Sequence, residues 1–95
     1  MSDVQVSIDK EASRYEAHLE GELAGYAEYR VDGDVVEFHH TVTDPKFGGR
    51  GVASALARRS LEDARDQGRT VLPTCSFYQG WIDKHPDYAD LLVRS

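Results

Sequence analysis

The amino-acid sequence predicts an α+β fold, in which an antiparallel meander of strands is followed by a helix, a strand and a second helix. Through the first part of the chain, apolar and polar side chains alternate with a period of two, which is typical of strands that bury one face. Farther along, apolar residues recur every three or four positions, which is the period of a helix. The 95 residues contain no linker or repeat, so we expect a single domain over residues 1–95, of a three-layer type.

The first part of the chain divides into four predicted strands, over residues 4–8, 14–20, 23–31 and 35–42. The alternation places Tyr15, Ala17 and Leu19 on one face of the second strand. In the third strand, the residues predicted to share a face are Gly25, Ala27, Tyr29 and Val31. The Asp-Gly-Asp sequence at residues 32–34 is a strong signal for a tight turn, so the third and fourth strands are expected to form a hairpin.

The change of period predicts a helix that begins near Ala53 and ends before Gly68, because glycine commonly follows the last helical turn. Its apolar stripe consists of Ala53, Leu56, Ala57, Ser60, Leu61 and Ala64. Residues 69–75 are apolar enough for a strand, although Pro73 has no N–H to donate to a neighbour. This strand is therefore expected at an edge, or leaving its neighbour near Pro73. A short helix and one or two further turns are predicted over residues 76–84 and 87–93. The spacing indicates core positions for Trp81, Tyr88 and Leu91.

Composition argues against several classes of function. The chain has 11 basic and 17 acidic residues and a net charge of −6, which disfavours a general nucleic-acid binder or a protein that binds anionic membranes. Its single cysteine, Cys75, cannot form an internal disulfide, so the sequence fits a reducing compartment. The N-terminal residues do not resemble a signal peptide, and no apolar run reaches the roughly 20 residues of a membrane-spanning helix. We therefore expect a cytoplasmic protein.

A glycine-rich loop at residues 48–51 lies between a predicted strand and a predicted helix. The first turn of a helix has backbone N–H groups without internal partners, and glycines let the backbone approach a ligand closely. From residue 46 to residue 69, six basic and three acidic residues give a local charge of +3 in an acidic chain. These features predict a site for a small anionic ligand, typically a phosphate. The alternative is a strand-to-helix turn without a ligand.

Two well-known phosphate motifs do not explain this loop. The P-loop requires a Gly-Lys pair, which the sequence lacks. The dinucleotide fingerprint fits residues 49–54 except at its last position. However, the preceding strands are predicted to form antiparallel hairpins, and a doubly wound dinucleotide-binding domain needs a longer chain.

The stretch Phe47-Gly48-Gly49-Arg50-Gly51-Val52-Ala53 resembles the acyl-CoA pyrophosphate loop of the GNAT superfamily of N-acetyltransferases. That loop is usually written Q/R-x-x-G-x-G/A, and residues 51–53 supply its end. Its first position falls on Gly48, which departs from the usual Gln or Arg. Either this departure weakens the contact with phosphate, or Lys46 and Arg50 supply the charge instead.

The last part of the chain strengthens this resemblance. Residues 71–78 and 81–88 are similar to a small GNAT subfamily, whose members are chains of about this length. Members of that subfamily carry a cysteine after the fifth strand, here Cys75, and a His-Pro-x-Tyr-like tail. The resemblance covers residues 35–92 and, more loosely, the whole chain.

The resemblance implies a GNAT-like fold and an acetyl-CoA-dependent N-acetyltransferase with an amine as acceptor. In such a fold two neighbouring strands part, and the pantetheine arm of acetyl-CoA lies between them. Pro73 stands where the last strand would leave its partner, and a backbone amide near Thr41 would polarise the thioester carbonyl. The implied acetyl-CoA contacts are Thr41, Val42, Gly48, Gly49, Arg50, Gly51, Val52, Ala53 and Ser54.

Three residues are candidates for the catalytic chemistry. Cys75 is a nucleophile, an acid for the leaving CoA thiolate, or simply a small buried side chain. His40 is a candidate general base, and its neighbour His39 would point to the opposite face; the alternative is one core and one exposed histidine. Tyr78 is a candidate proton donor to the thiolate, since Ile82 occupies the position of the usual GNAT tyrosine. No spacing of Cys, His or carboxylates predicts a metal site.

The sequence leaves two alternatives to catalysis. One is a non-catalytic acyl-CoA-binding module, which the departure at Gly48 favours, and the other is a small interaction domain. For an enzyme, we expect a small-molecule or protein amine as acceptor: a lysine, an N-terminus or a polyamine-like cation, attracted by the acidic surface. We expect no nucleic acid or membrane partner, and a monomer or weak dimer.

Overall fold

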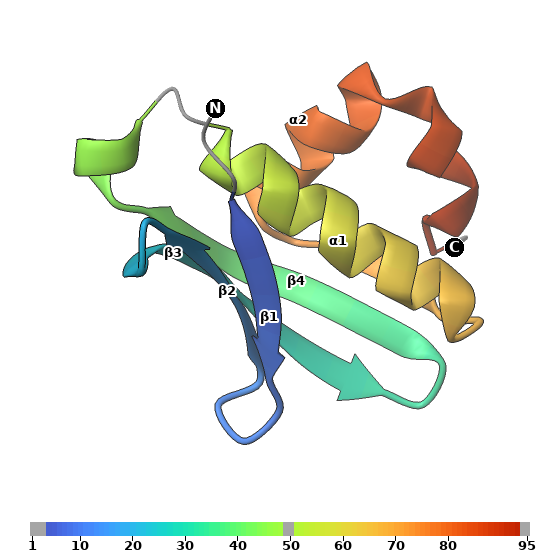
Figure 1. Ribbon diagram of the computed structural model, residues 1–95. Coiled ribbons are helices and arrows are strands. Elements are labelled where there is room, and N and C mark those ends of the chain that lie inside the picture. The colour runs from blue at the N-terminus through green and yellow to red at the C-terminus, as the bar shows by residue number, and fades with distance from the viewer. Residues whose placement is uncertain (1–3, 49–50, 94–95) are drawn as a thin grey trace.

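The computed structural model describes residues 4–48 and 51–93, which form five strands, two α-helices and two 3₁₀ helices. Their bounds are β1 (Gln5–Asp9), β2 (Arg14–Leu19), β3 (Glu22–Asp32), β4 (Val35–Thr43), η1 (Pro45–Phe47), α1 (Val52–Asp66), β5 (Thr70–Pro73), α2 (Ser76–Lys84) and η2 (Pro86–Leu91). All five strands form one sheet in chain order, and Figure 1 labels β1 to β4 of this sheet. The first four strands pair antiparallel, and β5 runs parallel to β4. The predicted meander and the α+β class are confirmed.

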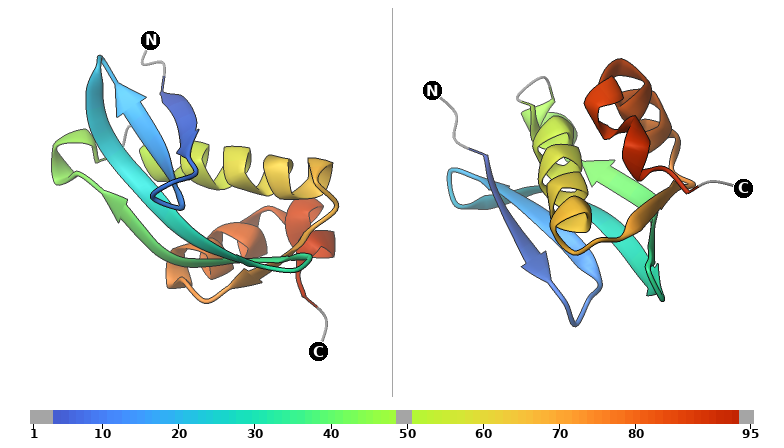
Figure 2. Two further views of the ribbon diagram at one scale, coloured as in Figure 1. Left: turned by 90° about the horizontal axis from the view of Figure 1, so that it is seen from below. Right: turned by 90° about the vertical axis from the view of Figure 1, so that its right-hand side faces the viewer.

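Both α-helices lie over the same face of the sheet (Figure 2). In β2, buried positions alternate with half-buried ones, and the residues that point away from the helices include Arg14 and Glu16. The fold therefore has two layers, where the sequence predicted three. The physical reason is that α1 forms the crossover between the parallel strands β4 and β5, and α2 then packs beside α1 through a bond between Ser60 and Tyr78.

Two register shifts interrupt the regular alternation of the sheet. One lies between the partners of Ala17 and His18, where β3 has an extra residue, Ala24, that is fully buried. As a consequence, Ala24 and Gly25 are both buried although they are neighbours in the chain. The shared face predicted for β3 extends to Val31, which lies opposite the buried Val36, although Val31 is 40% exposed near the hairpin end of the strand.

The predicted helical stripe forms the centre of the core. Five of its six residues are buried in α1, and Ala53 is half-buried. The helix ends at Asp66, and Gly68 follows with φ 69°, in the left-handed region that favours glycine. Its 15 residues make a rod of about 22 Å that runs across the sheet. Within the described residues, no helix has the length and apolar character needed to cross a membrane.

Aromatic side chains join α2 and η2 to this core. The ring of Tyr78 stacks on that of Phe38 from β4, with centroids 4.5 Å apart. Trp81, Tyr88 and Leu91 are buried, as their spacing predicted. His85 is half-buried, because its ring stacks on Trp81 at 3.8 Å and its Nδ1 lies 2.7 Å from the Trp81 carbonyl oxygen.

Gly25 allows α1 to start close to the sheet. A Cβ atom at this position would lie 2.6 Å from the carbonyl oxygen of Val42 and 3.0 Å from Cγ1 of Val52, the first residue of α1. The backbone of β4 cannot move away without breaking its pairing with β3. A side chain at this position would therefore push the first turn of α1 away from the strands.

We predict that Gly25→Ala lowers the free energy of unfolding by about 1–3 kcal/mol, because it overpacks a site bounded by backbone. Gly80→Ala is the matched control: nothing lies within 4 Å of its Cβ position, and alanine favours a helix interior by roughly 0.5–1 kcal/mol. Urea denaturation of both variants checks this. An unchanged stability for Gly25→Ala would contradict the close approach.

Candidate active site

The sheet opens between β4 and β5. The parallel pairing ends with Phe38 opposite Pro73. One further backbone bond, from the Cys75 N–H to the Phe38 carbonyl at 3.0 Å, closes this end before the chain enters α2. β4 continues to Thr43, so its second half has an edge that β5 does not cover. The expectation that the fifth strand leaves its neighbour near Pro73 is confirmed.

A thiol and a hydroxyl meet where the two strands part. The half-buried Cys75 precedes the first residue of α2, and its Sγ donates to Thr41 Oγ1 at 3.3 Å. The neighbouring Thr74 Oγ1 donates to Glu37 Oε2 at 2.8 Å and so attaches the end of β5 to β4. Two of the residues singled out in the sequence, Cys75 and Thr41, are therefore in contact, although 34 positions separate them.

β4 contains a bulge just before this contact. His39 is the residue left over where the register with β3 shifts, and it is half-buried. Beyond the bulge, Thr41 lies opposite the fully buried Ala27 and shares its side of the sheet, toward the helices. His40 is exposed, with its ring 6.2 Å from that of Tyr26. Because neighbouring residues of a strand face opposite sides, His40 lies on the other face of β4 from the thiol contact.

The N-terminus of α1 carries no side-chain cap. Gly51 occupies the N-cap position with φ 76°, which suits glycine, and its carbonyl accepts the first helical bond from Ala55 at 3.0 Å. The amides of residues 52–54 therefore have no helical acceptor, and the first turn contains no acidic residue. Free amides and the positive end of the helix dipole together suit an anion. Gly49 and Arg50, which were also predicted to contact it, lie outside the described residues.

The segment before the glycine loop is held by Asp44 and Glu22, which the sequence analysis did not single out. Asp44 caps the short helix η1, accepting from the Lys46 N–H at 3.0 Å, and Phe47 is buried. Lys46 Nζ lies 3.1 Å from the Glu22 carboxylate, so the cation expected to supply charge to the loop already has an anionic partner. The Asp44-Pro45 pair, an N-cap followed by proline at the first helical position, is the signal that identifies this turn.

Two more of the predicted acetyl-CoA contacts lie close to this segment. The Gly48 N–H donates to the Pro45 carbonyl at 3.1 Å, so it already has a partner within the turn. Val42 lines a hollow of about 340 Å³ between the ends of β3 and β4. The other residues that line it are Leu23, Ala24, Gly25, Tyr26, Thr43, Asp44 and Pro45.

Trp81 connects α2 to the start of α1. Its Nε1 donates to Ser54 Oγ at 3.2 Å, and the guanidinium of Arg58 lies over its ring at 5.6 Å. The exposed Arg58 thus adds a positive charge one turn beyond the free amides of α1. Sequence spacing placed Trp81 in the core but gave no signal that its indole N–H contacts the first turn of α1.

Tyr78 lies in the core and not at the opening. Its side chain is fully buried, stacked on Phe38, and its hydroxyl lies 2.8 Å from Ser60 Oγ of α1. Burial raises the pKa of the Tyr78 hydroxyl well above its usual value, which disfavours release of its proton. This geometry argues against Tyr78 as the proton donor to the CoA thiolate. It gives Tyr78 a structural role, in which its hydroxyl connects α2 to α1.

Comparison with known proteins shows the family to which the chain belongs. Residues 14–91, most of the chain, match the family described as GCN5-related N-acetyltransferase. The chain belongs to the GCN5-related N-acetyltransferase family. The resemblance seen in the glycine loop and the tail is confirmed, and the opening between β4 and β5 lies where that resemblance predicted parted strands.

Solved structures and a curated relative agree with this assignment. A GCN5-like protein from Staphylococcus aureus, solved by NMR, has 24% identity and a TM-score of 0.75, over 100% of this chain and 93% of that one. A Mycobacterium tuberculosis protein solved in complex with CoA has 26% identity and a TM-score of 0.65, over 81% of this chain and 50% of that one. An uncharacterized N-acetyltransferase from Methanocaldococcus jannaschii is 38% identical over 39 residues, which are 41% of this chain and 17% of that relative.

The stability of variants at Tyr78 and Ser60 tests the structural role of the bond between their hydroxyl groups. We predict that Tyr78→Phe destabilises the fold by only about 1 kcal/mol, since Ser60 keeps its bonds to the carbonyls of Leu56 and Ala57. Ser60→Ala should cost more, about 1–3 kcal/mol, because it leaves the Tyr78 hydroxyl buried without a partner. Thermal unfolding checks both values. Greater destabilisation by Tyr78→Phe than by Ser60→Ala would contradict this account.

Proposed function

We propose that the protein transfers an acetyl group from acetyl-CoA to an amine, with the opening between β4 and β5 as its active site. The observation that carries the proposal is the end of strand pairing at Pro73, which leaves a strand edge beside the thiol of Cys75. Membership of the N-acetyltransferase family supports the reaction class. The M. tuberculosis relative, which was solved with CoA, supports CoA as the carrier.

The described residues fit a CoA thioester in two places. The uncapped amides of residues 52–54, with no carboxylate in the first turn of α1, suit the pyrophosphate. The edge of β4 at Thr41 and Val42 offers backbone groups to an extended arm such as pantetheine. In this proposal the arm lies along β4 in place of the missing continuation of β5.

The proposed reaction is an acyl transfer. The amine attacks the thioester carbonyl carbon, the C–S bond breaks, and the proton that the amine loses balances the proton that the CoA thiolate gains. A backbone N–H of β4 near Thr41 stabilises charge on the carbonyl oxygen. We assign the protonation of the thiolate to Cys75, whose thiol already donates a hydrogen bond at the opening. His40, exposed on the outward face, takes the proton from an amine that approaches from that side.

The acceptor in this proposal is a cationic amine: a lysine or N-terminus of a protein, or a small polyamine. The chain has six more acidic than basic residues, and such a surface attracts cations. We place the enzyme in the cytoplasm as a monomer or weak dimer, in keeping with its single cysteine.

Titration of the ¹⁵N-labelled protein with acetyl-CoA tests the site. We predict amide shifts concentrated at Thr41, residues 51–54 and Cys75, because these groups line the proposed path of the ligand. Release of CoA with spermidine and with lysine-containing peptides then measures turnover. Binding without turnover would favour an acyl-CoA-binding module, and the absence of shifts at millimolar acetyl-CoA would leave an interaction domain.

Replacing Cys75 tests its role. We predict that Cys75→Ala lowers the rate of acetyl transfer by about 10²-fold, the contribution typical of a positioned acid, while acetyl-CoA affinity changes little. Cys75→Ser is the matched control, since a hydroxyl can still donate to Thr41, and it should recover part of the rate. Equal rates for the wild-type protein and Cys75→Ala would show that the thiol only packs against Thr41.

A further inference from the structure

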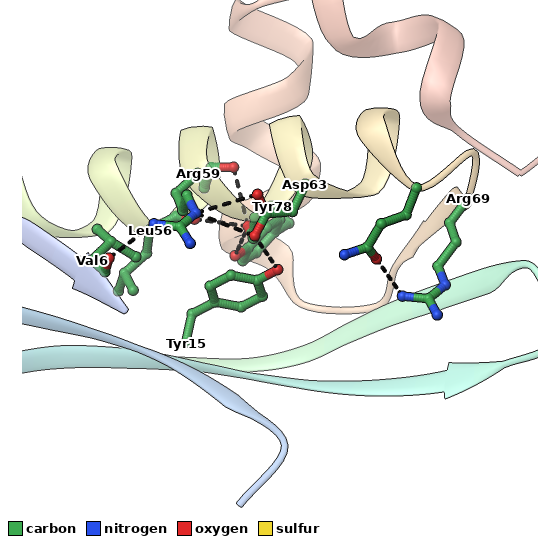
Figure 3. A network of polar contacts seen from close by, with 10 residues as sticks. Val6, Tyr15, Leu56, Arg59, Asp63, Arg69 and Tyr78 are labelled. Atoms are coloured by element: carbon green, nitrogen blue, oxygen red, sulfur yellow. Dashed lines mark hydrogen bonds and ion pairs between the residues drawn. The ribbon is translucent and has the colours of Figure 1, made fainter. Parts of the chain in front are cut away.

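A second hollow lies at the opposite end of α1 from the glycine loop. It encloses about 660 Å³ between the β1–β2 hairpin, the end of β3 and the residues that follow α1. Its walls include the rings of Tyr15 and Tyr29 and the apolar side chain of Ile8. Figure 3 shows Tyr15 and Arg69 between α1 and the sheet, near the C-terminal end of the helix.

The charged groups that line this hollow are all cations. They are Lys10 from the hairpin, Arg30 from β3 and Arg69 from the loop after α1, and no carboxylate residue lines it. This is unusual in a chain with 17 acidic and 11 basic residues. Arg30 contributes least, because its side chain is 69% exposed and lies 3.5 Å from Glu37. Lys10 and Arg69 are therefore the cations that define the chemistry of the hollow.

Arg69 is held in place, and its charge acts on the wall of the hollow. Its guanidinium donates to the side chain of Gln67, the C-cap residue of α1, and its backbone N–H donates to the Ala64 carbonyl at 2.9 Å. Tyr29 is close enough that the positive charge of Arg69 opposes the rise in the pKa of its hydroxyl caused by burial. A guanidinium and a phenol hydroxyl thus stand together as donors.

The carboxylates that act on the two wall tyrosines already have partners. Asp63 accepts from the Tyr15 hydroxyl at 2.8 Å and pairs with Arg59 at 3.2 Å. Asp9 accepts from the Ala12 N–H at 3.1 Å within the β1–β2 hairpin. Arg59 thus neutralises Asp63, whereas Asp9 keeps a negative charge that raises the pKa of Tyr29. Lys10 and Arg69 together outweigh this one charge, so the hollow offers net positive charge beside aromatic and apolar surface.

We propose that this hollow is a second ligand site, which takes a small organic anion. Arg69 and Lys10 hold its carboxylate or phosphate group, and its apolar or aromatic body packs on Tyr29 and Ile8. Arginine suits this role because its fork of N–H groups matches the geometry of both anions. A cation would be repelled here by the like charges of Lys10 and Arg69.

The proposal does not depend on acetyl transfer. α1 separates the hollow from the glycine loop by the length of the helix, about 22 Å. A ligand in the hollow would shift amides in residues 8–13, 29–31 and 67–69, none of which belongs to the proposed acetyl-CoA site. The same spectrum therefore reports on the two sites separately, and either proposal can fail alone.

Titration of the ¹⁵N-labelled full chain with benzoate, inorganic phosphate and benzylamine tests the site. We expect saturable shifts around the hollow with benzoate, weaker binding of phosphate because it lacks an apolar body, and no saturable shifts with benzylamine. Arg69→Gln should weaken benzoate binding by about tenfold or more, the loss typical of a charge-assisted hydrogen bond. Lys10→Gln, on the exposed hairpin, should weaken it as well without disturbing the fold.

Lys84→Gln is the matched control, because it removes an exposed cation from α2 that does not line the hollow. Benzoate affinity should be unchanged in this variant. The proposal is overturned if benzoate gives no saturable shifts around the hollow, or if Lys84→Gln weakens binding as much as Lys10→Gln and Arg69→Gln. Equal shifts with benzylamine, or phosphate that binds as tightly as benzoate, would also contradict a site for organic anions.

Discussion

The β4–β5 ladder ends where Phe38 lies opposite Pro73, and the geometry of the proposed active site follows from that limit. One more backbone bond, from the Cys75 N–H to the Phe38 carbonyl, follows the last pair, and the chain then turns into α2. The second half of β4 keeps its pairing with β3 and is therefore rigid on one side and open on the other. A thioester that lay along this edge would be held by backbone groups whose positions the sheet already fixes.

Aromatic packing holds the other side of the opening. α2 is a short helix of nine residues, and a helix of this length is not stable on its own. Phe38 and Tyr78 stack across the core, and the Ser60 hydroxyl joins α2 to α1. Trp81 adds a second connection to the first turn of α1. The position of the Cys75 thiol is thus set by buried contacts made farther along α2.

The sequence predicted best those features that local periodicity controls. In β2 the residues Tyr15, Ala17 and Leu19 are all buried, as their alternation indicated, and the stripe of α1 was placed almost residue for residue. The bulge at His39 was not predicted, because it depends on the register with β3 rather than on the order of residues in β4. The burial of Tyr78 was missed for a related reason: spacing along the chain does not reveal which side of a short helix meets its neighbour. The cation expected at the glycine loop, Lys46, pairs instead with Glu22, a contact between segments far apart in sequence.

The order of the strands has a consequence for how the molecule assembles. Because neighbours in the sheet are neighbours in the chain from β1 to β4, these strands can form by successive hairpins with short loops to close. The parallel contact is different, since Val35 meets Thr70 only after α1 has crossed the sheet. Contacts between distant residues carry a larger loop-closure entropy and form more slowly. We therefore expect the opening that we assign to acetyl-CoA to be the last part of the sheet to form, after the hairpins of β1 to β4.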